Sequence, residues 1–290
     1  MSYLTDRNAA PMLLNHIPPS APLSAWVRCY RIIEFKFDTS FPIAPKMYSP
    51  RPEHCLQFYP RDTEQVTYSN AAQNISGKRV TLSGQHTILQ HRSIGPDFLS
   101  VQVVFQPAGL YKLTGLPAAT LTNIYTAAED LLGSGVHLVN EALSEASSYP
   151  EMISIIERFL HTLIRKYERE KNSNSAIDSC AQRMLQTEER FSLDGFLREA
   201  CLSHRQFDRL FTERIGLAPK QFLQLIRFDK TYRLKNRQPS LDWLSVAVQS
   251  GYHDYQHLSK EYKTFTGYTP TRFFLLDQSA PERSFGEAET

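Results

Sequence analysis

The chain has 290 residues, which at roughly 150 residues per domain favours two domains. Of these residues 41% are hydrophobic and 21% are charged, which excludes a disordered, solvating polymer. The formal net charge is only +2, but residues 205–272 contain 12 basic and 6 acidic side chains, and the rest of the chain has an acidic excess. The basic charge is therefore concentrated near the C-terminus.

The cysteines and the apolar segments indicate the cellular compartment in which the protein is expected. Cys29, Cys55, Cys180 and Cys201 are scattered and form no CxxC pair, so neither a disulfide framework nor a zinc knuckle is expected. The first twenty residues lack the charged and then apolar order of a secretion signal. Nowhere do about 18 apolar residues follow one another, as a membrane-spanning helix requires. We expect a soluble, cytoplasmic protein with reduced thiols and no membrane contact.

The sequence pattern of the N-terminal half is typical of short strands that are separated by Pro, Gly, Asn and Asp. The β-branched and aromatic-rich runs are residues 25–35, 55–59, 65–68, 79–82 and 98–105. Short strands without helical patterns between them predict an antiparallel barrel or sandwich. Apolar residues then recur at three- and four-residue steps over residues 153–167, which predicts an amphipathic helix. This helix could form a dimer interface or pack on its own barrel.

The C-terminal part is helical and repeats itself. Residues 170–175 contain no large apolar side chain and predict a linker. From Ala176 onward, residues 209–222 correspond at a constant offset to residues 260–273, with Gly216 and Pro219 matching Gly267 and Pro270. Two copies of one helical unit therefore follow each other.

Each copy predicts a helix, a turn and a second helix. In the first copy Ser192 can cap the first helix, and Ser203-His-Arg-Gln206 is a capping box that begins the second. Phe207 and Phe211 then fall on the inner face of the second helix. Its opposite, polar face holds Arg205, Asp208, Arg209 and Thr212.

In the second copy, Asp242 and Asp254 cap the two helices, and Leu258 and Tyr262 point inward. The outward residues are Tyr255, Gln256, His257 and Lys260. Long hydrogen-bonding side chains on the first turns of an anchored helix are what reading the major groove of DNA requires. Arg and Lys at these positions suit guanine and Gln suits adenine, whereas Lys263, near the helix end, suits a phosphate.

A polar helix face is usually only solvated, and helix-turn-helix shapes without DNA contacts occur in all-helical proteins. Two tandem copies with matching caps, together with the local excess of basic residues, favour double-stranded DNA as the partner.

The repeated residues resemble a known family. The first motif is Ser203-x-Arg-Gln-Phe-x-Arg-x-Phe211-x-Glu-x-x-Gly216-x-x-Pro219-Lys-x-Phe222. The second is Gly251-Tyr-x-Asp254-x-x-His257-Leu-x-Lys260-x-Tyr262-Lys263-x-x-x-Gly267-x-Thr269-Pro270-x-x-Phe273. Together they resemble the AraC/XylS family of transcription regulators over about residues 176–275. The chain departs from the family at Leu197, where Ala is common, and at Cys201, where Gly is frequent in the turn.

The resemblance implies two helix-turn-helix units, joined by a long helix at about residues 219–234, that enter successive major grooves on one side of the duplex. The base-reading positions that it implies are Arg205, Asp208 and Arg209 in the first unit and Tyr255, Gln256, His257 and Lys260 in the second. It also implies a bacterial-type regulator that is not an enzyme, with no catalytic residue. It admits a small-molecule effector, RNA polymerase and a second copy of the chain as further partners.

The family commonly carries a β-rich, cupin-like sensor with a helical dimerisation element, and Phe105-x-Pro-x-Gly109-Leu110 resembles one uncharacterised sensor type. The predicted fold class is α+β: a β-rich, cupin-like barrel with helices, followed by an all-α domain of two tandem helix-turn-helix units. The predicted domains are a sensor and dimerisation domain at 1–170, a linker at 171–176, the DNA-binding domain at 177–277 and a flexible tail at 278–290. No ligand residue is predicted.

Other chemistries remain as alternatives. His86 and His91 lack the alternate-residue spacing that would place two imidazoles on one strand face, so we predict no metal site and no cofactor. Cys29 and Cys55 are expected to be buried structural cysteines rather than reactive thiols. The alternative functions are a cupin-type enzyme fused to a DNA-binding module, and a regulator controlled by a protein partner or by expression level without a ligand.

Overall fold

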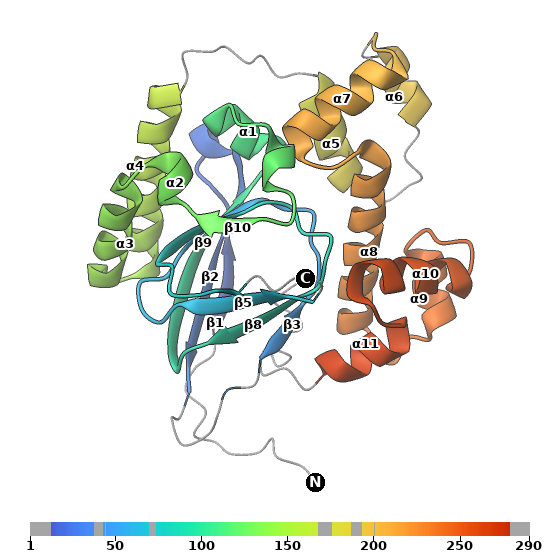
Figure 1. Ribbon diagram of the computed structural model, residues 1–290, viewed down its shortest axis with the longest axis horizontal. Helices are drawn as coiled ribbons and strands as arrows, with labels where there is room; N and C mark the ends of the chain where they lie inside the picture. Colours follow the sequence, from blue (N-terminus) through green and yellow to red (C-terminus); the bar gives the residue numbers. More distant parts are fainter. Residues whose placement is uncertain are drawn as a thin grey trace.

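The computed structural model describes residues 13–37, 43, 45–69, 74–167, 176–186, 193–199 and 201–278. The strands in these ranges are β1 (Leu13–Ile17), β2 (Val27–Lys36), β3 (Lys46–Tyr48), β4 (Cys55–Phe58), β5 (Glu64–Tyr68), β6 (Asn74–Ile75), β7 (Val80–Ser83), β8 (Gln90–Ile94), β9 (Asp97–Phe105) and β10 (Tyr125–Ala127). They form a six-stranded sheet in the order β1-β2-β9-β4-β7-β10 and a four-stranded sheet in the order β3-β8-β5-β6. The two sheets face each other (Figure 1). The β-rich, cupin-like architecture is confirmed, with two open sheets rather than a closed barrel.

The six-stranded sheet is apolar on one face and carries buried polar residues among apolar ones on the other. On β9, Leu99, Val101 and Val103 belong to the hydrophobic core, whereas the alternate residues Ser100 and Gln102 are polar and only 0% and 3% exposed. Successive side chains of a strand point to opposite faces, so this alternation assigns the polar face to the space between the two sheets. Burying a polar face is costly unless its groups find partners.

Helices cover the apolar face of this sheet (Figure 1). The helices of the N-terminal half are η1 (Ala21–Leu23), α1 (Gly109–Thr114), η2 (Ala118–Leu121), α2 (Glu129–Leu132), α3 (Gly135–Glu145) and α4 (Tyr149–Tyr167). The amphipathic helix predicted at residues 153–167 is confirmed as α4. Its residues Ile156 and Leu160 are buried in the core of the sheet, and the Phe159 ring meets Phe58 edge-on at 6.3 Å. The apolar side of α4 therefore packs on the protein's own sheet.

The C-terminal half is helical. It consists of α5 (Ala176–Gln186), α6 (Leu193–Glu199), α7 (His204–Ile215), α8 (Pro219–Arg237), α9 (Trp243–Gln249), α10 (Tyr255–Thr266) and α11 (Pro270–Asp277). Figure 1 shows α5, α6 and α7 at one end of α8, and α9, α10 and α11 at the other end. The joining helix predicted at residues 219–234 is confirmed as α8. The described residues contain no helix that is long and apolar enough to cross a membrane.

Three predicted features fall wholly or mostly on residues that the structure does not describe. The cap at Ser192 is one. The linker at 171–176 lies outside the described residues except for Ala176, which begins α5, and the tail at 278–290 lies outside them except for Gln278.

Candidate nucleic-acid interface and buried pocket

The first candidate recognition helix, α7, is fixed at both ends. The Ser203 hydroxyl accepts a hydrogen bond from the Gln206 backbone N–H at 3.4 Å, and the Gln206 side-chain oxygen accepts one from the Ser203 N–H at 3.2 Å. This is the predicted capping box. At the other end Gly216 has a φ of +94°, and its N–H donates to Thr212 O at 2.9 Å. Glycine adopts this left-handed conformation without steric cost, and it therefore commonly ends a helix at this position.

The second unit uses aspartates in the same places. The Asp242 carboxylate accepts from the N–H groups of Leu244 and Ser245, both at 3.0 Å, and begins α9. Asp254 accepts from the His257 N–H at 2.7 Å and begins α10. Both predicted caps are confirmed, so each recognition helix starts at the residue that the sequence indicated.

Buried ion pairs hold the inner faces of the two recognition helices. Arg214 of α7 forms two bonds, of 2.7 and 2.8 Å, with the carboxylate of Asp178 in α5. In the second unit Glu261 of α10 pairs with Arg227 of α8 and accepts a hydrogen bond from the Tyr252 hydroxyl at 2.8 Å. The sequence patterns did not predict these pairs. Their signal was a charged residue on the otherwise apolar face of each helix.

Most predicted base-reading side chains are exposed. Arg205, Asp208 and Arg209 are exposed on α7, and Gln256, Lys260 and the predicted phosphate contact Lys263 are exposed on α10. Tyr255 and His257 are half-buried. These placements leave two polar helix faces available to a partner, and the reading of bases by these residues stays a prediction.

Two of these side chains have neighbours within the protein. Arg209 is 70% exposed and lies 3.9 Å from Glu213, a surface pair too weak to immobilise it. The His257 ring meets Tyr252 edge-on at 5.4 Å, and its Nε2 lies 3.6 Å from the Glu261 carboxylate. The protein therefore fixes the direction of His257 more firmly than that of Arg209.

The two departures from the family motif are accommodated locally. Cys201 has a φ of +51°, in the left-handed region that favours glycine, and Gly251 in the second unit has a φ of +83°. The turn thus keeps the same handedness with a side chain present. Leu197 is 5% exposed and is part of the same hydrophobic core as Phe207. The first unit therefore has a larger core side chain at this point than the second, which has Ala247.

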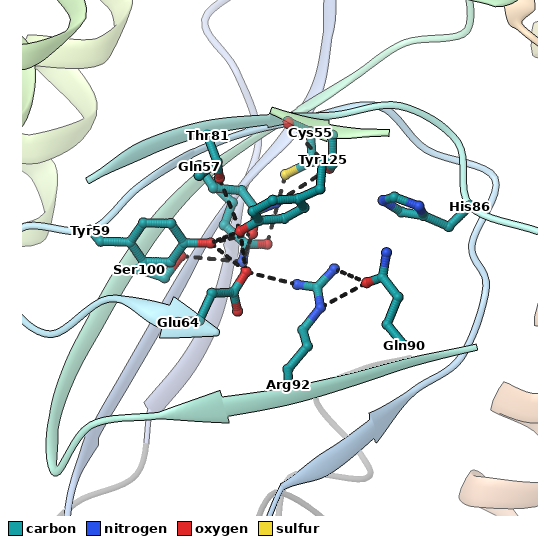
Figure 2. Close-up of polar contacts among 12 residues, drawn as sticks. Cys55, Gln57, Tyr59, Glu64, Thr81, His86, Gln90, Arg92, Ser100 and Tyr125 are labelled. Atoms are coloured by element: carbon teal, nitrogen blue, oxygen red, sulfur yellow. Dashed lines mark hydrogen bonds and ion pairs between the residues drawn. The ribbon is translucent and has the colours of Figure 1, made fainter. Parts of the chain in front are cut away.

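The N-terminal half contains a polar pocket between its sheets. Figure 2 shows Glu64 and Arg92 of the small sheet pointing toward Gln57, Thr81 and Tyr125. Tyr59 Oη lies 2.5 Å from Glu64 Oε1 and 2.6 Å from Tyr125 Oη. Tyr125 donates a short hydrogen bond to the same carboxylate oxygen. Burial, and then the charge of Glu64, raise the pKa of both tyrosines well above the usual value.

Arg92 connects this cluster to the rest of the pocket. Its guanidinium lies 3.3 Å from Glu64, donates to Gln90 Oε1 at 3.0 and 2.7 Å, and stacks 3.8 Å from the centre of the Tyr48 ring. One space is mostly polar and has Ser83, His86 and Gln102 in its wall. A second space has Ile33, Phe35 and Phe98 in its wall. Tyr48, Arg92 and Gln102 line both spaces.

His86 is neutral within this pocket. It is 9% exposed, and burial, followed by the charge of Arg92, lowers its pKa to about 3. His91, the other predicted alternative ligand, is half-buried on β8. Cys55 is buried as expected, whereas Cys29 is half-buried, and both are free thiols. Within the described residues, His, Cys, Asp and Glu form no group of three or more that could hold a metal ion.

The pocket residues were missed by the sequence analysis. Their signal was the alternation of polar with apolar residues in Cys55-Leu-Gln57, Thr81-Leu-Ser83 and Ser100-Val-Gln102. Because the apolar residues face the helices, the polar ones had to face the second sheet.

Two helix-turn-helix units with capped second helices and exposed polar faces define a protein of the helix-turn-helix DNA-binding class. Residues 196–275 match the family model described as a helix-turn-helix domain. Residues 15–127 match a model described as a domain of unknown function (DUF6597).

Two known transcriptional regulators are similar in sequence to part of this chain. An uncharacterised HTH-type transcriptional regulator of Haemophilus influenzae is 26% identical over 106 residues, or 36% of this chain and 34% of the relative. The HTH-type transcriptional regulator ArgR of Pseudomonas aeruginosa is 26% identical over 83 residues, or 29% of this chain and 25% of the relative. The chain thus spans about a third or less of the length of these relatives. The C-terminal domain is therefore a helix-turn-helix domain similar to those of HTH-type transcriptional regulators, in agreement with the resemblance of its motifs to the AraC/XylS family.

Among solved structures, the chain is similar to ToxT from Vibrio cholerae, with 12% identity and a TM-score of 0.45 over 85% of this chain and 97% of ToxT. A structure of ToxT with a bound unsaturated fatty acid covers 93% of this chain and 97% of that chain, with 13% identity and a TM-score of 0.45.

Proposed function

We propose that the protein is a sequence-specific DNA-binding transcriptional regulator that inserts α7 and α10 into successive major grooves. The observation that carries the proposal is the pair of capped helices with buried inner faces and exposed polar outer faces. Arg205, Asp208, Arg209, Tyr255, Gln256, His257 and Lys260 read bases, and Lys263 contacts a phosphate.

The test is selection of duplexes from a random-sequence pool by the full-length protein, followed by fluorescence anisotropy of an enriched duplex. Neutralising six or more phosphates should make the affinity fall by about 10³-fold or more between roughly 50 and 200 mM salt. Lys260→Ala should weaken binding. Arg158→Ala, an exposed cation on the opposite side of the N-terminal domain in α4, is the matched control and should bind as the wild type does. Failure to enrich any duplex with salt-sensitive binding would contradict the function.

In this proposal the N-terminal domain regulates DNA binding, and it does so by binding a small molecule between its sheets. The two spaces share Arg92 in their walls and suit a compound with an apolar body and a head that accepts hydrogen bonds from Arg92. Screening the full-length protein for thermal shifts should therefore find compounds of this kind. Ile33→Trp, which fills the apolar space, should remove the shift. A shift that survives in this variant would place the effector elsewhere.

RNA polymerase and a second copy of the chain are further partners in this proposal, and the cytoplasm is its compartment. Leu138 of α3 is 69% exposed beside α4, which offers an apolar contact for a second copy. Analytical ultracentrifugation of the wild type and Leu138→Glu checks this point. A wild type that remains monomeric throughout would exclude the dimer.

A further inference from the structure

The C-terminal end of α7 is held by the N-terminal domain. Gln85 Nε2 donates a hydrogen bond to Ile215 O at 2.9 Å, and the Thr122 hydroxyl donates one to Gly216 O at 2.6 Å. The last carbonyl groups of a helix have no partner inside the helix and must find one elsewhere. For α7, two residues far away in the sequence provide these partners.

The second unit serves as an internal comparison, because α10 ends in the same way. Gly267 has a φ of +79°, and its N–H donates to Lys263 O at 3.0 Å. A Cβ added at Gly267 would have no described neighbour within 4 Å. One added at Gly216 would lie 3.1 Å from Ala118 O and 3.2 Å from Thr122 Oγ1. In the part of the chain that the structure describes, the N-terminal domain thus encloses this glycine of the first unit and not its counterpart.

A second contact reaches the exposed side of α7. The Tyr111 hydroxyl of α1 donates to Glu213 Oε1 at 3.2 Å, and the Arg214 guanidinium lies 4.6 Å from the centre of the Tyr111 ring. The other oxygen of Glu213 lies 3.9 Å from Arg209. The N-terminal domain therefore approaches α7 one turn from a predicted base-reading side chain.

The two capping residues stand next to the wall of the polar pocket. Gln85 lies between Gly84 and the pocket residue His86, and Thr122 lies three positions before Tyr125. Their segments are bonded to each other, Gly84 N to Ile124 O at 3.1 Å and Asn123 N to Gln85 O at 2.9 Å. The pairing of β7 with β10 thus continues beyond the sheet as far as the end of α7.

We propose that Gln85 and Thr122 are positioning residues for DNA recognition: from the N-terminal domain they set the orientation of α7, whereas no residue that the structure describes in that domain caps the end of α10 in this way. The inference rests on the proposed function, because orientation matters only if α7 enters a groove. Both side chains bond to carbonyl groups at the end of the helix, so they act on the angle of α7 and touch no base.

The experiment uses the full-length protein, a duplex that the wild type enriches from a random pool, and the variants Gln85→Ala, Thr122→Val and Thr122→Ser. Hydrogen exchange should quicken at amides of residues 209–216 in the first two variants and stay unchanged at residues 255–266. Footprints should weaken in the groove of the first unit and persist in the other. In the double variant Gln85→Ala/Thr122→Val, which lacks both hydrogen bonds, affinity should fall on the order of tenfold. Thr122→Ser keeps the hydroxyl donor and should behave as the wild type.

Thr120→Val is the matched control, because Thr120 lies exposed on η2, the short helix that Thr122 follows, and among the described residues its hydroxyl bonds only to Pro117 O, at 2.7 Å. Unchanged exchange and footprints in Gln85→Ala and Thr122→Val would overturn the proposal. Equal loosening of α7 and α10 would also overturn it, because that result indicates a general loss of stability. The absence of any enriched duplex for the wild type would instead contradict the proposed function, so the two failures are distinguishable.

Discussion

Arg209 and Lys263 separate base reading from phosphate contact at the scale of single residues. Arg209 is largely exposed in the middle of α7, whereas Lys263 is exposed in the last turn of α10. A bidentate Arg–guanine contact is worth about 1–3 kcal/mol of discrimination, so Arg209→Ala should weaken cognate binding and relax the preference at one base pair. Lys263→Ala should weaken all sequences about equally and lower the salt slope by roughly one. Anisotropy against a set of single-base variants measures both effects.

Melting curves are the control for these two variants, since exposed side chains should leave stability within about 0.5 kcal/mol. If Arg209→Ala kept the sequence preference and Lys263→Ala changed it, the roles would be assigned the wrong way round.

His86 makes the stability depend on pH. An unfolded histidine has a pKa near 6.5, and burial followed by the Arg92 charge lowers the folded pKa of His86 to about 3. Below pH 6.5 the unfolded chain binds a proton that the folded protein excludes, so the free energy of unfolding falls as the pH falls. Above this pH the contribution of His86 to the free energy of unfolding is fully present. Between pH 7 and about 5.5 the loss from His86 alone should be about 1 kcal/mol.

Urea unfolding of His86→Gln at these two pH values should show a smaller loss by about that amount. His204→Gln, which changes an exposed imidazole, is the matched control and should show the loss of the wild type. An identical pH dependence in His86→Gln would mean that His86 takes up its proton in the folded state too.

At the scale of elements, the sequence predicted what is local. Ser203, Asp242 and Asp254 are caps because their side chains bond to backbone groups two or three positions away, so the capping patterns sufficed. The strands β2, β4, β5, β7 and β9 were predicted from their β-branched and aromatic residues. Strand β8 was missed because Gln90-His-Arg-Ser carries polar side chains, and Arg92 finds its partners in Gln90 of the same strand and Glu64 of the neighbouring strand β5.

The two helix-ending glycines form a matched pair of elements. Gly216→Ala and Gly267→Ala both place a side chain in the left-handed region, at a cost of roughly 1–2 kcal/mol each. Only the first also presses a Cβ against Ala118 O and Thr122 of the N-terminal domain. Gly216→Ala should therefore lower the free energy of unfolding more than Gly267→Ala, as chemical denaturation would measure. Equal losses would mean that the contact with η2 yields without cost.

At the scale of the whole molecule, the contacts between the two halves could not be predicted from the sequence. Gln85 and Ile215 are 130 positions apart, and no local pattern marks either as a partner of the other. The polar pocket is non-local in the same way, because Glu64 and Tyr125 come from different sheets. The family resemblance predicted the class of protein, whereas the contacts between its two halves are evident only in the folded structure.

The length of α8 predicts how the protein reads DNA. Its 19 residues span roughly 28 Å at 1.5 Å per residue, which suits recognition helices in major grooves about one turn, or ~34 Å, apart. One chain should therefore protect two grooves on one face of an asymmetric site. Inserting about 5 bp between the two contacted segments turns one of them to the opposite face and should abolish one set of contacts in a footprint. Inserting about 10 bp restores the face but exceeds the reach of α8, so affinity should stay low. Recovery with the longer insertion would show that the two grooves are read by separate protomers.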